Sequence, residues 1–88
     1  MEKYKILIKP SAVKELEAIP QKTLRQQIIR RIQSLVTDPF PPGASKLAGN
    51  DRFRLRQGAY RIIDTVWKLQ LTINVIKVGH RKDIYRNQ

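Results

Sequence analysis

The residues best suited to chemistry stand near the end of the chain, in the run VGHRKDIYR at positions 78–86. His80 is the only histidine among the 88 residues. A histidine can transfer a proton near neutral pH, and an arginine can hold a phosphate with its planar guanidinium. A tyrosine such as Tyr85 can stack on a base or donate its hydroxyl hydrogen. This run therefore predicts proton transfer beside a phosphate, provided that other parts of the chain also bind phosphate.

A second run, RFRLR at positions 52–56, alternates arginine with an apolar residue. As a strand it would place three guanidinium groups on one face and two apolar side chains on the other. Like charges on alternate residues repel one another, and exposed strands more often mix in Thr, Glu or Gln. The pattern therefore favours binding of a polyanion over a merely solvated face.

The composition agrees with a polyanion partner. Lys and Arg number 18 against 7 Asp and Glu, a formal net charge of +11, and such a field attracts nucleic acid first. Hydrophobic residues make up 41% of the chain, which indicates a folded domain rather than a basic tail. The chain has no cysteine, one histidine and seven scattered carboxylates, so we expect neither a metal site nor a cofactor. With no long apolar run and no signal-peptide pattern, we expect a soluble, cytoplasmic protein without membrane contact.

The length predicts one domain, residues 1–88, whose first elements are a strand and two helices. Residues 4–9 have the composition of a strand near a sheet edge. Ser11 is expected to cap a helix that runs to Ile19 and is closed by Pro20. Residues 24–36 repeat apolar side chains at helical spacing, and this stripe is a core face by default rather than a partner groove. The Asp-Pro pair at 38–39 ends the second helix, and residues 40–50 are expected to form a surface loop.

Three further strands are expected at 52–56, 60–66 and 71–78, joined as a meander through Gly58 and a weakly specified turn at 67–70. Trp67 is interpreted as a partly buried packing residue, with a partner contact as the alternative. Residues 80–88 are too polar to extend the last strand and are expected to form a turn or a short helix. The predicted fold is α+β: an N-terminal strand, a two-helix hairpin and a three-stranded antiparallel meander, in one sheet covered by helices.

Adjacent strands in such a meander would bring the arginines and the tail together around His80. Metal-free RNA cleavage needs a base for the 2′-hydroxyl proton, cations for the pentavalent phosphate and an acid for the leaving 5′-oxygen. Proton transfer suits His80, although a lone histidine is more often a structural or incidental surface residue. The candidate catalytic residues are His80, Arg61, Arg81, Tyr85 and Arg54, and the candidate RNA-binding residues are Lys46, Arg52, Arg54, Arg56, Lys82 and Arg86.

The segments PFPPGASKLAG, RFRLRQGAYRII and KVGHRKDIYR, in this order, resemble the RelE side of the RelE/ParE superfamily of toxins from toxin–antitoxin systems. The resemblance implies an endoribonuclease that cuts mRNA in the ribosomal A site, leaving cyclic phosphate and 5′-OH ends. It also implies a cognate acidic antitoxin as partner, besides mRNA and the ribosome.

The family's functional positions fall on Arg52, Arg54, Arg61, Arg81 and Tyr85. The best-known members carry lysines in the strand where this chain has arginines. Since arginine does not readily lose a proton, this departure makes Arg54 a phosphate clamp and leaves His80 to transfer protons. Two alternatives stay open: a ParE-like toxin that poisons DNA gyrase by protein contact, and a non-catalytic RNA-binding module.

Overall fold

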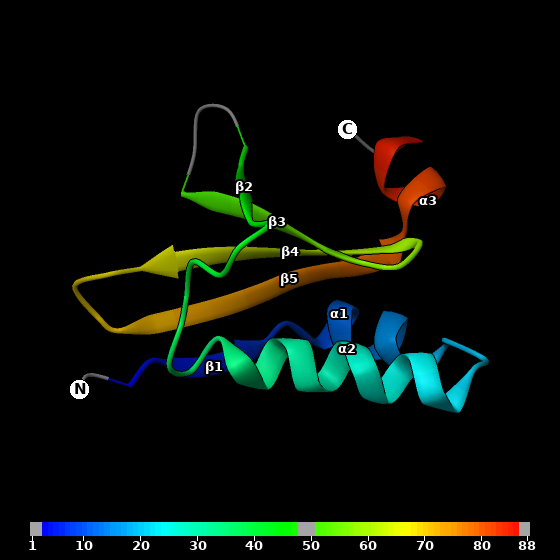
Figure 1. The fold of residues 1–88 in the computed structure, drawn as a ribbon, viewed down its shortest axis with the longest axis horizontal. Helices are drawn as coiled ribbons and strands as arrows, with labels where there is room; N and C mark the ends of the chain where they lie inside the picture. Colours follow the sequence, from blue (N-terminus) through cyan, green and yellow to red (C-terminus); the bar gives the residue numbers. More distant parts are fainter. Residues whose placement is uncertain (1–2, 48–50, 87–88) are drawn as a thin grey trace.

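The computed structural model describes residues 3–47 and 51–86, with the side chains of residues 85 and 86 left aside. Its elements, drawn in Figure 1, are β1 (Lys5–Ile8), α1 (Pro10–Glu17), α2 (Lys22–Ser34), β2 (Ser45–Lys46), β3 (Arg52–Gln57), β4 (Tyr60–Trp67), β5 (Thr72–His80) and α3 (Arg81–Arg86). Within these ranges no helix combines the length and the apolar character needed to cross a membrane.

The strands form one mixed sheet in the order β1-β5-β4-β3-β2. Strand β1 lies at an edge and pairs parallel to β5, while the other neighbours are antiparallel. The predicted α+β fold, its meander and its edge strand are confirmed. The predicted loop at 40–50 needs correction, because Ser45 and Lys46 pair with β3 as a fifth strand. A two-residue strand is too short to leave an alternating pattern in the sequence.

The start of α1 differs from the expected one. The helix begins at Pro10, with Lys9 as the N-cap and no side-chain capping bond, so Ser11 lies inside the first turn. Proline suits this position because its fixed φ is already helical and the missing N–H has no helical partner to lose. The helix ends at Glu17, so Ile19 is buried from just beyond it rather than from its last turn.

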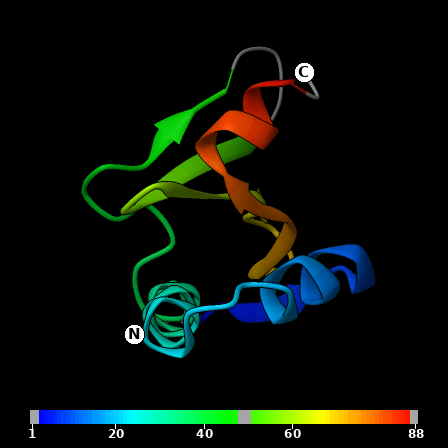
Figure 2. The same cartoon turned by 90° about the vertical axis from the view of Figure 1, so that its right-hand side faces the viewer.

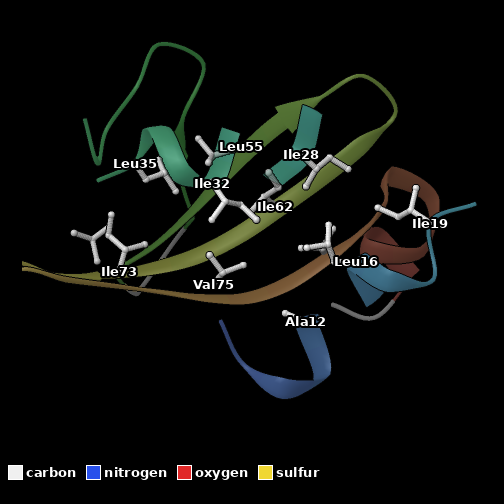
Figure 3. Packing of buried hydrophobic residues seen from close by; sticks show 12 residues of the cluster. Ala12, Leu16, Ile19, Ile28, Ile32, Leu35, Leu55, Ile62, Ile73 and Val75 are labelled. Carbon is white, nitrogen blue, oxygen red and sulfur yellow. The ribbon is translucent and has the colours of Figure 1, made fainter. Parts of the chain in front are cut away.

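The main core lies between the sheet and the α1–α2 layer (Figure 3). Its buried residues come from both helices and from three strands: Ala12, Leu16, Ile19, Ile28, Ile32, Leu35, Leu55, Ile62, Val66, Ile73, Val75 and Val78. The apolar stripe predicted for the second helix is therefore a core face, with Ile28 and Ile32 at its centre.

The short helix α3 packs on the opposite side of the sheet, as Figure 2 shows. Ile84 is 1% exposed and Ile63 is 7% exposed, yet neither belongs to the main cluster. Gly79 permits this packing, because a Cβ there would stand 3.2 Å from Cγ1 of Ile84. Of the two forms expected for residues 80–88, a turn or a short helix, the structure has a short helix at Arg81–Arg86, and it folds back over the end of β5.

Two expectations at the strand ends are wrong. Strand β5 continues through Gly79 to His80, because β4 offers partners for both residues, Arg61 and Tyr60. Trp67 is 40% exposed rather than packed, next to Leu69 at 95%. The turn between β4 and β5 closes with Leu71 at φ 49, a conformation that few side chains adopt.

Candidate nucleic-acid interface

Three arginines lie at the end of the sheet where β5 meets α3. Arg56 lies opposite Arg61, and Arg61 lies opposite Gly79 on its other side. Side chains at opposed positions project from the same face of a sheet. The N–H of Arg81 donates to the carbonyl oxygen of Ala59 at 2.8 Å, so the ladder continues to the start of α3. The side chain of Arg81 is exposed at the start of α3.

Arg61 also shapes the turn between β3 and β4. Its side chain is 7% exposed, and Nη1 donates to the carbonyl oxygens of Gly58 at 3.0 Å and Tyr60 at 2.9 Å. Gly58 has φ 60, where glycine meets no steric penalty. A guanidinium has five N–H donors, so Nη2 still carries two that a phosphate oxygen could accept.

The remaining arginines of β3 lie progressively farther along the same face. Arg54 is half-buried opposite Ile63, and Arg52 is exposed opposite Thr65. Four residues of strand separate Arg52 from Arg56, about 13 Å. Lys46 is exposed and lies opposite Phe53, so alternation assigns it to the other face. The structure therefore groups Arg54 and Arg56 with the tail but leaves Lys46 and Arg52 apart from it.

His80 does not share the face of the arginines. It lies opposite Tyr60, which packs against the main core, and the two rings meet edge to face with centroids 5.6 Å apart. Its Nδ1 accepts a hydrogen bond from the N–H of Lys82 at 3.2 Å. In the neutral imidazole the hydrogen is then on Nε2, which acts as a donor. His80 thus stands at the end of β5 but on the side of α1.

The other tail residues are described in part. Lys82 is exposed in the first turn of α3, and its backbone holds the His80 ring as described above. Tyr85 and Arg86 lie in the last turn of the same helix, with side chains outside the described part of the chain. Their predicted contacts with RNA stay predictions.

Sequence reasoning passed over Asp64, whose side chain is 0% exposed. Neither carboxylate oxygen has a hydrogen-bond partner among the residues that the structure describes. Its neighbours across the strands are Phe53 and Val75. Burial raises the pKa of Asp64 to about 7. The sequence does carry a signal for this buried position. Asp64 lies two residues from Ile62 and two from Val66, so in a strand it shares their face, which is expected to point toward the core.

This arrangement suits binding of a phosphate backbone. Guanidinium groups stay charged, match phosphate oxygens and carry no proton that is easily lost. Among the described residues no group of three or more His, Cys, Asp or Glu side chains could hold a metal ion. The cationic face over β3 and β4 is exposed at Arg56, half-buried at Arg54 and buried at Arg61, and it can attract phosphates by electrostatics and hydrogen bonding.

The fold and this basic face define a small α+β protein of the class found among toxins of type II toxin–antitoxin systems. A family model described as the ParE toxin of the type II toxin–antitoxin system parDE matches residues 6–85. The chain belongs to this family, within the RelE/ParE superfamily.

Individual relatives agree with this assignment. A RelE-like toxin protein from Escherichia coli is 28% identical over 87 residues, covering 94% of this chain and 90% of the relative. The archaeal RelE–RelB complex from Pyrococcus horikoshii contains a chain that is 26% identical, with a TM-score of 0.77 and coverage of 90% and 96%. The RelBE2 complex from Mycobacterium tuberculosis, at 20% identity, supports the fold alone, with a TM-score of 0.78 and coverage of 90% and 99%.

Proposed function

We propose that this toxin is a metal-independent endoribonuclease that cleaves mRNA in the ribosomal A site. The observation that carries the proposal is that Arg56 and Arg61 share the face opposite α1 and α2, at the end of the sheet where Arg81 begins α3. The ribosome as the place of action is what the resemblance to RelE toxins implies, and the RelE-like relatives support the toxin class.

The proposed reaction is attack of the 2′-oxygen on the adjacent phosphorus with loss of the 5′-oxygen. It leaves a 2′,3′-cyclic phosphate and a 5′-OH end. Arg61, with Nη1 bonded to the turn, would present Nη2 to a phosphate oxygen, and Arg81 would approach from the start of α3. Arg54 would bind the next phosphate along β3. Donors aimed at the developing negative charge stabilise the transition state.

His80 is the candidate for proton transfer, and its contacts in the structure set two requirements for this role. Because Nδ1 accepts from the N–H of Lys82, the free ring nitrogen is Nε2. To act as a base at Nε2, the ring would have to adopt the other tautomer and release Lys82. The scissile nucleotide would also have to pass over the end of β5, since His80 and the arginines lie on different faces. Tyr85 is proposed to stack on a neighbouring base.

The test is incubation with programmed ribosomes, followed by mapping of the new mRNA ends. Arg61→Lys and Arg81→Ala should lower the cleavage rate at least 100-fold, a loss typical for one transition-state donor. Arg30→Ala, which removes an exposed arginine from α2, is the matched control and should cleave normally. Absence of new ends with the wild type would refute the activity. Equal rates for Arg61→Lys, Arg81→Ala and the control would refute the site.

His80 is tested by two substitutions. His80→Phe keeps a ring beside Tyr60 but cannot transfer a proton, whereas His80→Gln keeps a hydrogen-bonding group without the ring. If proton transfer is its role, both variants lose cleavage to a similar extent. Retention of activity by His80→Phe alone would show that the ring itself is what matters.

A second function has one observation in its favour, because the matching family model is that of ParE toxins. A ParE-like toxin would inhibit DNA gyrase by protein contact and would need no proton transfer. Inhibition of purified gyrase supercoiling, with ribosomal mRNA left intact, would support this alternative and exclude the first.

We further propose an acidic antitoxin as the partner; the archaeal relative is itself found in a RelE–RelB complex. Strand β1 offers an open sheet edge, since among the strands of residues 3–47 and 51–86 it pairs with β5 alone. An apolar groove of about 390 Å³ runs between β1 and α2, lined by Ile6, Ile8, Leu16, Ile29, Ile32, Gln33 and Val36. A partner strand on the edge and a partner helix in the groove would cover this surface while acidic residues offset the +11 charge.

The antitoxin proposal is tested with the product of a neighbouring small acidic gene. Ile29→Asp, in the groove, should weaken its binding at least tenfold, while Gln26→Asp on the exposed side of α2 should not. Binding of equal strength to both variants would place the interface elsewhere.

A further inference from the structure

A cleft lies at the open edge of β5, beyond the point where β1 ends. Strand β1 accompanies β5 only as far as Val75, which lies opposite Ile8. Past this point Glu15 of α1 contacts the edge of β5. Its carboxylate accepts hydrogen bonds from the backbone N–H of Val78 and from Nζ of Lys77, each at 3.1 Å. The cleft continues from there toward the tail, between α1 and the first turn of α3.

The cleft has a volume of about 290 Å³ and three kinds of wall. Ala18 and Ile19 give an apolar side, and the rings of Tyr60 and His80 give an aromatic one. The polar groups include the carboxylates of Glu15 and Asp83. Small-molecule sites usually hold about 300–1,000 Å³, so this volume suits one planar group rather than a whole nucleotide.

The charges of the walls select against phosphate. Glu15 and Lys77 form an ion pair and offset each other, so Asp83 gives the lining a net negative charge that repels an anion. The arginines that suit phosphate lie on the other face of the sheet. A nucleobase fits the cleft instead, because its flat faces can contact rings and apolar side chains while its edge offers hydrogen-bond donors. Asp83 is exposed in the first turn of α3 and can accept such donors.

We propose that this cleft is a base-binding subsite that takes the base next to the scissile phosphate and prefers a base with an amino group. The subsite rests on the proposed ribonuclease function, since the arginine face must hold the phosphate of the same strand. Because Ile84 covers Gly79 on the arginine side, the RNA would pass around the end of β5 beside His80, with phosphates on the arginine side and one base turned toward α1. Asp83 accepts a hydrogen bond from the amino group, and Tyr60 and His80 contact the ring.

Binding is measured without catalysis by titrating the protein with cytidine and with uridine. These nucleosides carry no phosphate and differ along one edge of the base: cytosine has an amino donor at C4 and an acceptor at N3, whereas uracil has an oxygen acceptor at C4 and an N–H donor at N3. Nuclear magnetic resonance should show that cytidine shifts the Tyr60 and His80 ring signals saturably. The affinity for uridine, measured in the same way, should be at least fivefold lower. Equal affinities, or no saturable shift at these rings at millimolar nucleoside, would overturn the proposal.

Two variants locate the site. Asp83→Ala should remove the preference for cytidine. Ala18→Phe should fill the cleft and lower the affinity for both nucleosides at least tenfold. Thr23→Phe adds the same ring at an exposed position of α2 and should bind like the wild type. Unchanged binding by Ala18→Phe would refute the location.

The same variants separate this proposal from the ribonuclease function. If ribosomal cleavage occurs and Ala18→Phe cuts at the same positions and rates as the wild type, the subsite is wrong and the function stands. If cytidine binds in the cleft but no mRNA is cut, the base site stands without the ribonuclease function.

Discussion

Asp64 should make the stability of this protein depend strongly on pH. Its side chain is fully buried, and its oxygens lack partners among the described residues. Burial without a cation or hydrogen-bond donor disfavours the charged form, which is why the pKa rises from 3.8 to about 7. Asp64→Asn keeps the shape of the side chain and removes its charge, so it isolates this effect.

The direction and the size of this pH effect follow from the pKa values of Asp64 in the unfolded and folded states. The folded state holds the proton more tightly than the unfolded state, so raising the pH from about 4 to about 7 destabilises the fold. A rise of about three pKa units at about 1.36 kcal/mol each gives a loss of about 4 kcal/mol above pH 7. Domains of this size typically have a free energy of unfolding of about 5–15 kcal/mol, so this loss is a large fraction of the total stability.

The assay is thermal and urea unfolding by circular dichroism between pH 4 and pH 8. Wild type and Asp64→Asn should be similar at pH 4, and at pH 8 the variant should be more stable by about 4 kcal/mol, roughly 15–30 °C in Tm. Asp38→Asn, which neutralises an exposed carboxylate, should instead follow the wild type at every pH. Parallel curves for wild type and Asp64→Asn over the whole range would refute the reasoning.

Three further outcomes are expected. Gly79→Ala places a Cβ 3.2 Å from Cγ1 of Ile84, so α3 should exchange its amide hydrogens faster; unchanged exchange would mean that the helix packs otherwise. Glu15→Ala leaves the Val78 N–H without its acceptor and should cost about 1–3 kcal/mol in urea unfolding, whereas Glu15→Gln, which keeps an acceptor oxygen, should restore most of this loss. Arg56→Ala should reduce the slope of log K against log salt for single-stranded RNA by about 0.7, and an unchanged slope would remove Arg56 from the interface.

Much of the fold could be predicted from spacing. The helical repeat in α2 and the strict alternation in β3 each predict one apolar face that must be buried. Ile28, Ile32 and Leu55 lie on these faces and are core residues in the structure. The length of β5 could not be predicted, since Gly79 and His80 belong to the strand only because Arg61 and Tyr60 lie opposite. The pairing of Ser45 and Lys46 likewise depends on β3 and not on their own sequence.

The face of His80 escaped prediction for a specific physical reason. Unbroken alternation from Ile73 and Val75 would place Lys77 toward the core and His80 beside the arginines. The register between β4 and β5 shifts at Ile63/Asp64, so that Ile63 lies opposite Lys77 and Asp64 lies opposite Val75. One extra residue in a strand exchanges the faces of everything that follows. Val78 therefore enters the core, and His80 follows it to the side of α1.

This single irregularity determines which groups an RNA strand would meet on each side of the sheet. Without the shift, a histidine would join three arginines, and one face would hold phosphate and proton-transfer groups together. With it, Gly79 stands opposite Arg61, where the absence of a side chain lets Ile84 close over the strand, and His80 stands beside Tyr60 in the cleft. Separate faces for phosphate and base are a consequence of the register. Proton transfer and base contact by His80 both require one nucleotide to pass around the end of β5, and action of Nε2 as a base requires in addition that the ring change its tautomer and lose the hydrogen bond from Lys82.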